Sequence, residues 1–76
     1  MFVPVLGETF DMFISLEAPM YEILELVKKG ISKMSYGRFL ANEDTVICYR
    51  DNGNIVNINL SVYELNIVNG TKLMLI

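Results

Sequence analysis

The first quarter of the chain alternates apolar and polar side chains with a period of two residues. Residues 2–6 are apolar and read as one strand, and Gly7-Glu8 follows as a turn. The alternation continues from residue 10 to residue 17. The side chains that share its apolar face are Phe10, Met12, Ile14 and Leu16. The pattern predicts an N-terminal β-hairpin made of residues 2–6 and 10–17.

After Ala18-Pro19 the apolar spacing changes to three and four residues, which is the spacing of an amphipathic helix. Proline is well tolerated in the first turn of a helix, so we expect the helix to begin there. The apolar residues at this spacing are Met20, Ile23, Leu24, Val27 and Ile31. Because glycine has a low helix propensity, we expect the helix to fray or end near Gly30.

The second half of the chain is predicted to contain three further strands. Asp51-Asn52-Gly53-Asn54 contains Asn-Gly, which is typical of a type I′ hairpin turn because both central residues of that turn need a positive φ. This turn would join a strand over residues 45–50 to a short strand over residues 55–58. The other expected elements are a loop over residues 35–44, one helical turn over Ser61–Leu65, a turn at Val68-Asn69-Gly70 and a last strand over residues 71–76.

The predicted order is therefore ββαββ, a short helical turn and a final strand. One amphipathic helix packed on one face of a mixed sheet gives a two-layer α+β domain. The 76 residues have the length of one domain, residues 1–76. Because this order of elements resembles that of the β-grasp, or ubiquitin-like, fold, we expect that arrangement.

Composition and charge limit the classes of partner. Apolar residues make up 53% of the chain, so we expect either a dense core with scattered surface apolar groups or an apolar surface that binds a protein partner or a second copy. The net charge is −3 and the basic residues do not cluster, which argues against nucleic-acid binding. The single Cys48 forms no internal disulfide, and no stretch approaches the ~20 apolar residues of a membrane span. We expect a cytoplasmic protein that does not insert into a membrane.

The residues that carry catalysis elsewhere do not form a recognisable group in this sequence. The chain has no histidine, so Ser-His and Cys-His chemistry lacks its usual base. Cys48 lies in mid-strand and is expected to pack rather than react. Asp51-Asn52-Gly53-Asn54 resembles part of a calcium loop, but the other ligands are missing and turn formation explains these residues better. We expect no enzyme activity, no cofactor and no bound metal.

A pattern near the end of the chain points to a family. An apolar residue, an acidic residue, Ile, Asn-Gly and alternating apolar residues follow one another, here as Val62, Glu64, Ile67, Asn69-Gly70, Leu73 and Leu75. This pattern resembles the YukD/EsaB-like family of bacterial ubiquitin-like proteins, which accompany type VII secretion systems, and T-F-D-M-F-I-S-L before Ala18-Pro19 fits that family as well. The resemblance implies a non-conjugated accessory or regulatory protein that binds components of the secretion machinery.

Ubiquitin and its sulfur-carrying relatives act through a flexible tail that ends in Gly-Gly. In this chain the last residues, Leu73–Ile76, belong to the predicted last strand. If the native chain stops at Ile76, conjugation and sulfur transfer are excluded. Two alternatives stay open: a ubiquitin-like interaction module from another bacterial context, and a modifier or sulfur carrier truncated before its tail.

Strand parity predicts an apolar surface on the sheet face away from the helix. The residues expected to face the helix are Val3, Val5, Ile47, Tyr49, Leu73 and Leu75. Cys48 and Arg50 are expected on the opposite face. That face would also carry one contiguous apolar patch made of Phe2, Phe13, Val46, Met74 and Ile76. We expect the patch to bind a protein; the alternative is that these are isolated exposed residues without a role.

Overall fold

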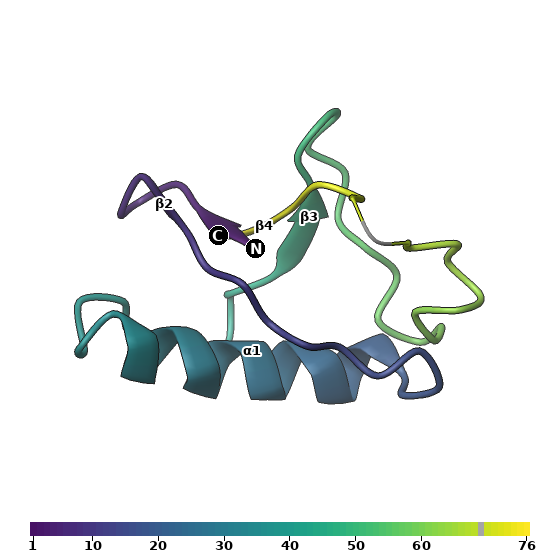
Figure 1. Ribbon diagram of the computed structural model, residues 1–76, viewed down its shortest axis with the longest axis horizontal. Coiled ribbons are helices and arrows are strands. Elements are labelled where there is room, and N and C mark those ends of the chain that lie inside the picture. Colours follow the sequence, from purple (N-terminus) through teal and green to yellow (C-terminus); the bar gives the residue numbers. More distant parts are fainter. Residues whose placement is uncertain (69) are drawn as a thin grey trace.

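A helix lies against one face of a mixed sheet (Figure 1). The computed structural model describes residues 1–68 and 70–76, and within these residues the sheet has four strands in the order β2-β1-β4-β3. Strand β1 is antiparallel to β2 and parallel to β4, and β4 is antiparallel to β3. The elements are β1 (Phe2–Val3), β2 (Glu8–Thr9), α1 (Met20–Met34), β3 (Ile47–Tyr49) and β4 (Leu73–Leu75). The predicted α+β class with one helix is confirmed.

The core forms where α1 meets the sheet. The predicted apolar face of the helix is buried at all of its positions, from Met20 to Ile31. Val3 and Leu75 come from the sheet and are fully buried against this face, and Phe39 closes the core beyond the helix. The burial of Val3, Ile47, Leu73 and Leu75 confirms their predicted direction.

Strand β1 is shorter than the predicted strand over residues 2–6. The chain turns directly after Val3, because the N–H groups of Leu6 and Gly7 both donate to the Val3 carbonyl, at 3.0 and 2.9 Å. Gly7 has a φ of +64°, which glycine adopts without strain. Val5 lies in this turn with 77% of its surface exposed, so the prediction that it faces the helix was wrong.

The predicted second strand over residues 10–17 is not formed as a strand. Pairing with the first strand ends where Phe10 and Met1 exchange two hydrogen bonds of 2.9 Å. Beyond that point the alternation survives, since Met12 and Ile14 are half-buried against the core. Leu16 is exposed, contrary to the prediction, because it lies in a bend whose carbonyl accepts a bond from the Tyr63 N–H.

Helix α1 continues past Gly30 to Met34, so the predicted end near Gly30 was wrong. The absence of a side chain at Gly30 makes room for the tip of Met12, which packs against the helix there. The helix ends in a Schellman motif, in which the Tyr36 N–H donates to the Lys33 carbonyl and the Gly37 N–H to the Ser32 carbonyl.

The hairpin that begins with β3 differs in its turn from the prediction. Gly53 has a positive φ but Asn52 does not, so the turn is not type I′. Instead the Gly53 N–H donates to the Tyr49 carbonyl at 2.8 Å, and the Asn52 side chain accepts from the Asn54 N–H at 2.8 Å. The predicted return strand over residues 55–58 is reduced to a bridge between Ile55 and Cys48.

The predicted helical turn after residue 60 is confirmed, and it forms a capping box. Ser61 and Glu64 exchange bonds, since the N–H of each donates to the side-chain oxygen of the other at 3.0 and 3.1 Å. Asn66 ends the turn with a φ of +56°. Asn69, the centre of the predicted turn at residues 68–70, lies outside the described residues.

The segment before this turn also caps α1. The N-cap residue of the helix is Pro19, which supplies no side-chain hydrogen bond to the first turn. Its first N–H groups donate to carbonyls of that segment, Met20 to Leu60 at 2.8 Å and Tyr21 to Ile58 at 3.0 Å. These bonds satisfy donors that a helix N-terminus leaves open, so residues 58–60 fix the helix relative to the sheet.

Candidate protein-binding surface

Four of the five predicted patch residues share the face of the sheet that lies away from α1. Met74 is the middle residue of β4, and its neighbours Leu73 and Leu75 point into the core. Met74 therefore points to the opposite face. Its registered partner on β1 is Phe2. On the other side, β3 continues its pairing to Val46 and Ile76, which exchange hydrogen bonds of 2.9 and 3.0 Å.

We call Phe2, Val46, Met74 and Ile76 the sheet-face patch. Its members differ in accessibility, because Ile76 is 51% exposed whereas the other three are half-buried. Apolar side chains on adjacent strands of one face lie close enough to act as one surface. The patch is thus smaller and less exposed than the sequence predicted.

Arg50 accounts for part of this reduced exposure. Its guanidinium carbon lies 4.0 Å from the centroid of the Phe2 ring. A guanidinium over an aromatic face is held by the quadrupole of the ring and shields that face from water. Arg50 is exposed, as predicted, and it gives the patch a positive charge at one side.

Cys48 lies on this face but is not accessible. The prediction placed it outward beside Val46, and its register opposite Met74 agrees with that direction. It is nevertheless only 1% exposed, because Met74 flanks it on one side and Ile55 on the other. Cys48 is a packing residue in the centre of the patch.

Ile55 is the member of this surface that the sequence did not reveal. Its bridge to Cys48 places it on the same face, and it is 63% exposed. The bridge completes an apolar row across the sheet, formed by Phe2, Met74, Cys48 and Ile55. The hairpin register would have identified Ile55, but that register depends on the length of the turn, which Asn-Gly alone does not specify.

Phe13 does not belong to the patch. It lies in the segment between β2 and α1, and no strand pairing with a described residue places it beside the other four. Its side chain is fully exposed. It borders a hollow of about 500 Å³ whose other walls include Val68 and Thr71.

A second hollow adjoins the patch at Ile76. It has a volume of about 500 Å³, within the range of small binding sites, and the exposed apolar side chains of Val5 and Leu40 line it together with Ile76. The patch therefore continues from the sheet into a concave apolar surface.

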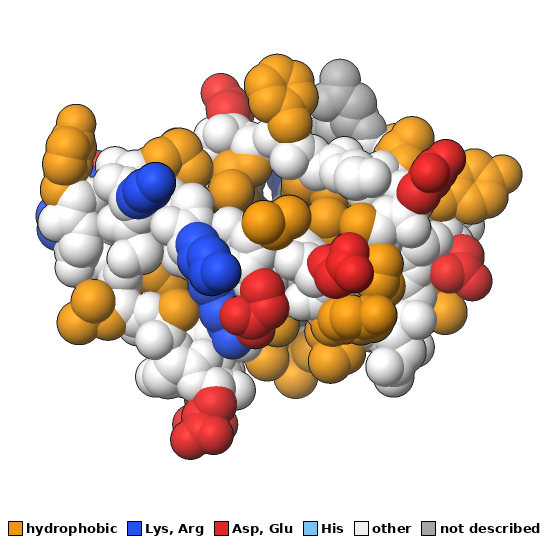
Figure 2. Space-filling view, turned by 90° about the horizontal axis from the view of Figure 1, so that it is seen from below, with side chains coloured by type: hydrophobic (Ala, Val, Ile, Leu, Met, Phe, Trp, Pro, Cys, Tyr) orange, Lys and Arg blue, Asp and Glu red, His pale blue; other side chains and the backbone are white. Residues whose placement is uncertain are grey.

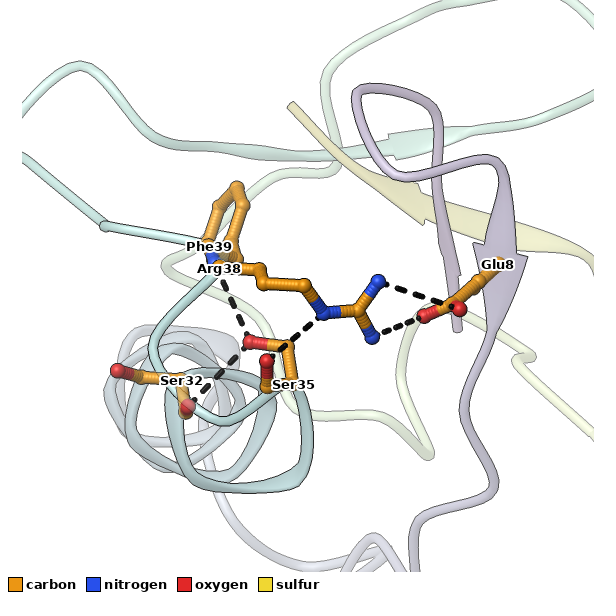
Figure 3. Close-up of polar contacts among 5 residues, drawn as sticks. All are labelled: Glu8, Ser32, Ser35, Arg38 and Phe39. Atoms are coloured by element: carbon orange, nitrogen blue, oxygen red, sulfur yellow. Dashed lines mark hydrogen bonds and ion pairs between the residues drawn. The ribbon is translucent and has the colours of Figure 1, made fainter.

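Polar contacts after α1 hold the wall of this hollow in place (Figure 3). The buried Ser35 Oγ donates to the Ser32 carbonyl at 3.3 Å and accepts from the Phe39 N–H at 3.2 Å. Arg38 Nε donates to the Ser35 carbonyl at 3.0 Å. The other end of its guanidinium forms a bidentate ion pair with Glu8, at 2.7 and 3.3 Å. The pair links the segment after α1 to β2.

The opposite face of the molecule has a different character. Figure 2 shows the α1 side, where basic side chains gather toward the C-terminal end of the helix and acidic side chains toward its N-terminal end. Glu22 lies in the first turn and Lys33 in the last, an arrangement that complements the helix dipole. This charge separation stabilises the helix, which also exposes the apolar side chains of Tyr21, Leu26 and Met34.

A search of the described residues finds no group of three or more potential metal ligands. None of the helices formed by those residues is both long and apolar enough to span a membrane. Comparisons of the chain with protein-family models, curated proteins and solved structures returned no match.

Proposed function

We propose that this chain is a protein-binding module with a β-grasp fold that serves as a non-covalent accessory protein of a type VII secretion system. The fold assignment is supported by the sheet, in which β4 lies between β1 and β3 and runs parallel to β1, with one helix across the sheet. This arrangement is compatible with a β-grasp. The secretion context is supported by the resemblance of Val62–Ile76 to the YukD/EsaB-like pattern.

The apolar row across the sheet is the observation that supports binding. Phe2, Met74 and Ile55 lie in one row across the sheet, with the buried Cys48 between Met74 and Ile55. Arg50 stacks over the Phe2 end of the row. Aromatic, methionine and arginine side chains are enriched at the centres of protein interfaces. A partner that covers the row would displace water from side chains that contribute little to the core.

The adjoining hollow gives this surface a shape that a partner would recognise. An apolar side chain of the partner would enter between Val5, Leu40 and Ile76, while the flat part of the interface would cover Met74. The polar contacts of Arg38 and Ser35 preorganise one wall of the hollow, which lowers the entropy cost of binding.

Affinity capture tests the proposal. The purified chain is immobilised and exposed to a lysate of the source organism, and the retained proteins are identified by mass spectrometry. Wild type and Leu26→Asp should retain the same proteins, because Leu26 is exposed on α1, which packs against the other face of the sheet. Met74→Asp and Ile76→Asp should lose them, because a carboxylate in an apolar interface lacks a partner.

Circular dichroism shows whether each variant is folded, so that loss of binding is not confused with loss of structure. The binding role of the patch is wrong if folded Met74→Asp and Ile76→Asp variants retain what wild type retains. The secretion assignment is wrong if the proteins lost by both variants include no component of a secretion system.

A further inference from the structure

The segment between β2 and α1 has a backbone edge that pairs with no strand among the described residues. Neither the N–H nor the C=O groups of residues 11–15 form a hydrogen bond with any described residue. In Figure 1 this segment leaves β2 and descends from the level of the sheet toward the start of α1. An extended segment with free N–H and C=O groups at the edge of a sheet is a template for a further strand.

The direction of these groups follows from the bonds on either side. In an extended chain, successive residues point their N–H and C=O groups to opposite sides. Phe10 is bonded to Met1, and the Leu16 carbonyl accepts from the Tyr63 N–H, so the even-numbered residues point into the molecule. The odd-numbered residues therefore point their backbone N–H and C=O groups to the outside; these residues are Asp11, Phe13 and Ser15.

We propose that this edge pairs with the same edge of a second copy of the chain and forms a symmetric antiparallel dimer. A two-fold interface requires a segment that is complementary to itself. The side chains at the outward positions, Asp11, Phe13 and Ser15, are all exposed, so none has to leave the core. The Phe13 ring is fully exposed, and the second copy would cover it.

Charge selects the register of this pairing. When the two segments are centred on Phe13, the two rings lie opposite each other and Asp11 lies opposite Ser15, so no like charges meet. Centring on Ile14 places Asp11 opposite Glu17 on both sides of the dimer, which is repulsive. Centring on Met12 avoids repulsion but places each ring against Asp11. The Phe13-centred register is therefore the favoured one.

The first test compares Ser15→Pro with Ser15→Ala. Both variants remove the exposed hydroxyl group, but only proline removes the outward N–H group, and proline is tolerated at the edge of a sheet. Sedimentation equilibrium should show that wild type and Ser15→Ala form dimers with the same dissociation constant. For Ser15→Pro the constant should rise about thirtyfold, because the symmetric dimer loses one backbone bond on each side.

Amide hydrogen exchange supplies a second readout that is specific for this edge. On concentration, the N–H groups of Asp11, Phe13 and Ser15 should become protected, whereas those of Met12 and Ile14 should keep their rates. The proposal is overturned if wild type is monomeric up to its solubility limit, or if Ser15→Pro dimerises as wild type does. It is also overturned if a different protein, rather than a second copy, protects these three groups.

Dimer formation through residues 11–15 does not depend on the sheet-face patch. Met74→Asp should leave the dimer unchanged, because Met74 lies in β4 and β1 separates it from the free edge. Ser15→Pro should still be retained by any partner that recognises the patch. The binding role of the patch and the dimer are therefore tested by separate measurements, and failure of one does not contradict the other.

Discussion

Gly30 tests whether Met12 and the helix constrain one another. Replacing a glycine inside a helix by alanine favours folding by about 1 kcal/mol, because glycine has more conformational freedom to lose. In this chain an added Cβ at Gly30 would lie 2.6 Å from Cε of Met12, which is too close for undistorted contact. The atom in the way is the end of a flexible side chain, so Met12 has to turn away and gives up part of its packing.

The gain in helix propensity and the loss of Met12 packing oppose each other. The effect of Gly30→Ala on the free energy of unfolding therefore depends on whether Met12 is present. In wild type, Gly30→Ala should change the free energy of unfolding by less than about 0.5 kcal/mol, because the displaced Met12 offsets most of the propensity gain. In a Met12→Ala background the space is free, and the same substitution should stabilise by about 1 kcal/mol. The coupling energy between the two positions is then on the order of 0.5 kcal/mol or more.

Urea unfolding of the four proteins, followed by circular dichroism of the helix, measures this cycle. Equal m-values would show that the substitutions change stability rather than the compactness of the unfolded chain. If Gly30→Ala has the same effect with and without Met12, the contact between them carries no energy. The continuation of α1 past Gly30 would then need another explanation.

Two further predictions concern the ends of helical segments. Tyr36→Gly should raise the thermal midpoint by about 6 °C, because Tyr36 has a φ of +54°, which glycine adopts without strain. Tyr36 is almost fully exposed, so the substitution loses no contact. Tyr36→Ala is the control and should bring no such gain. The Ser61 N–H holds the pKa of Glu64 below its usual value of 4.5, so Glu64 adds stability above that pH and loses it as the pH falls through the lowered pKa. Glu64→Gln should remove this acid dependence in pH-resolved unfolding, and an unchanged pH profile would contradict the role assigned to the capping box.

The helix could be predicted from the sequence because its signal is local. An apolar residue recurs every three or four positions from Met20 to Ile31, and all of these side chains are buried. The capping box at Ser61 and Glu64 is also a local pattern, with a spacing of three residues. Such signals need no knowledge of the rest of the chain.

The errors occur where one segment depends on another. Alternation predicted a strand over residues 10–17, but a strand exists only where a second segment pairs with it, and the pairing ends at Phe10. Parity placed Cys48 outward, but its burial depends on Ile55, which the turn register brings beside it. The contact of Arg50 with Phe2 likewise joins residues that are distant in the sequence. None of these relations is contained in a local pattern.

The proposed dimer edge at residues 11–15 would strengthen binding through the sheet-face patch. Directly opposed residues of antiparallel strands point to the same face of a sheet. Pairing two copies through residues 11–15 would therefore join their sheets side by side and place both sheet-face patches on the same side of the dimer. A partner that is itself repeated, as the subunits of a ring or a membrane complex are, would meet two patches at a fixed distance. Binding the second patch then becomes intramolecular, so the dimer would hold such an assembly more tightly than either patch alone.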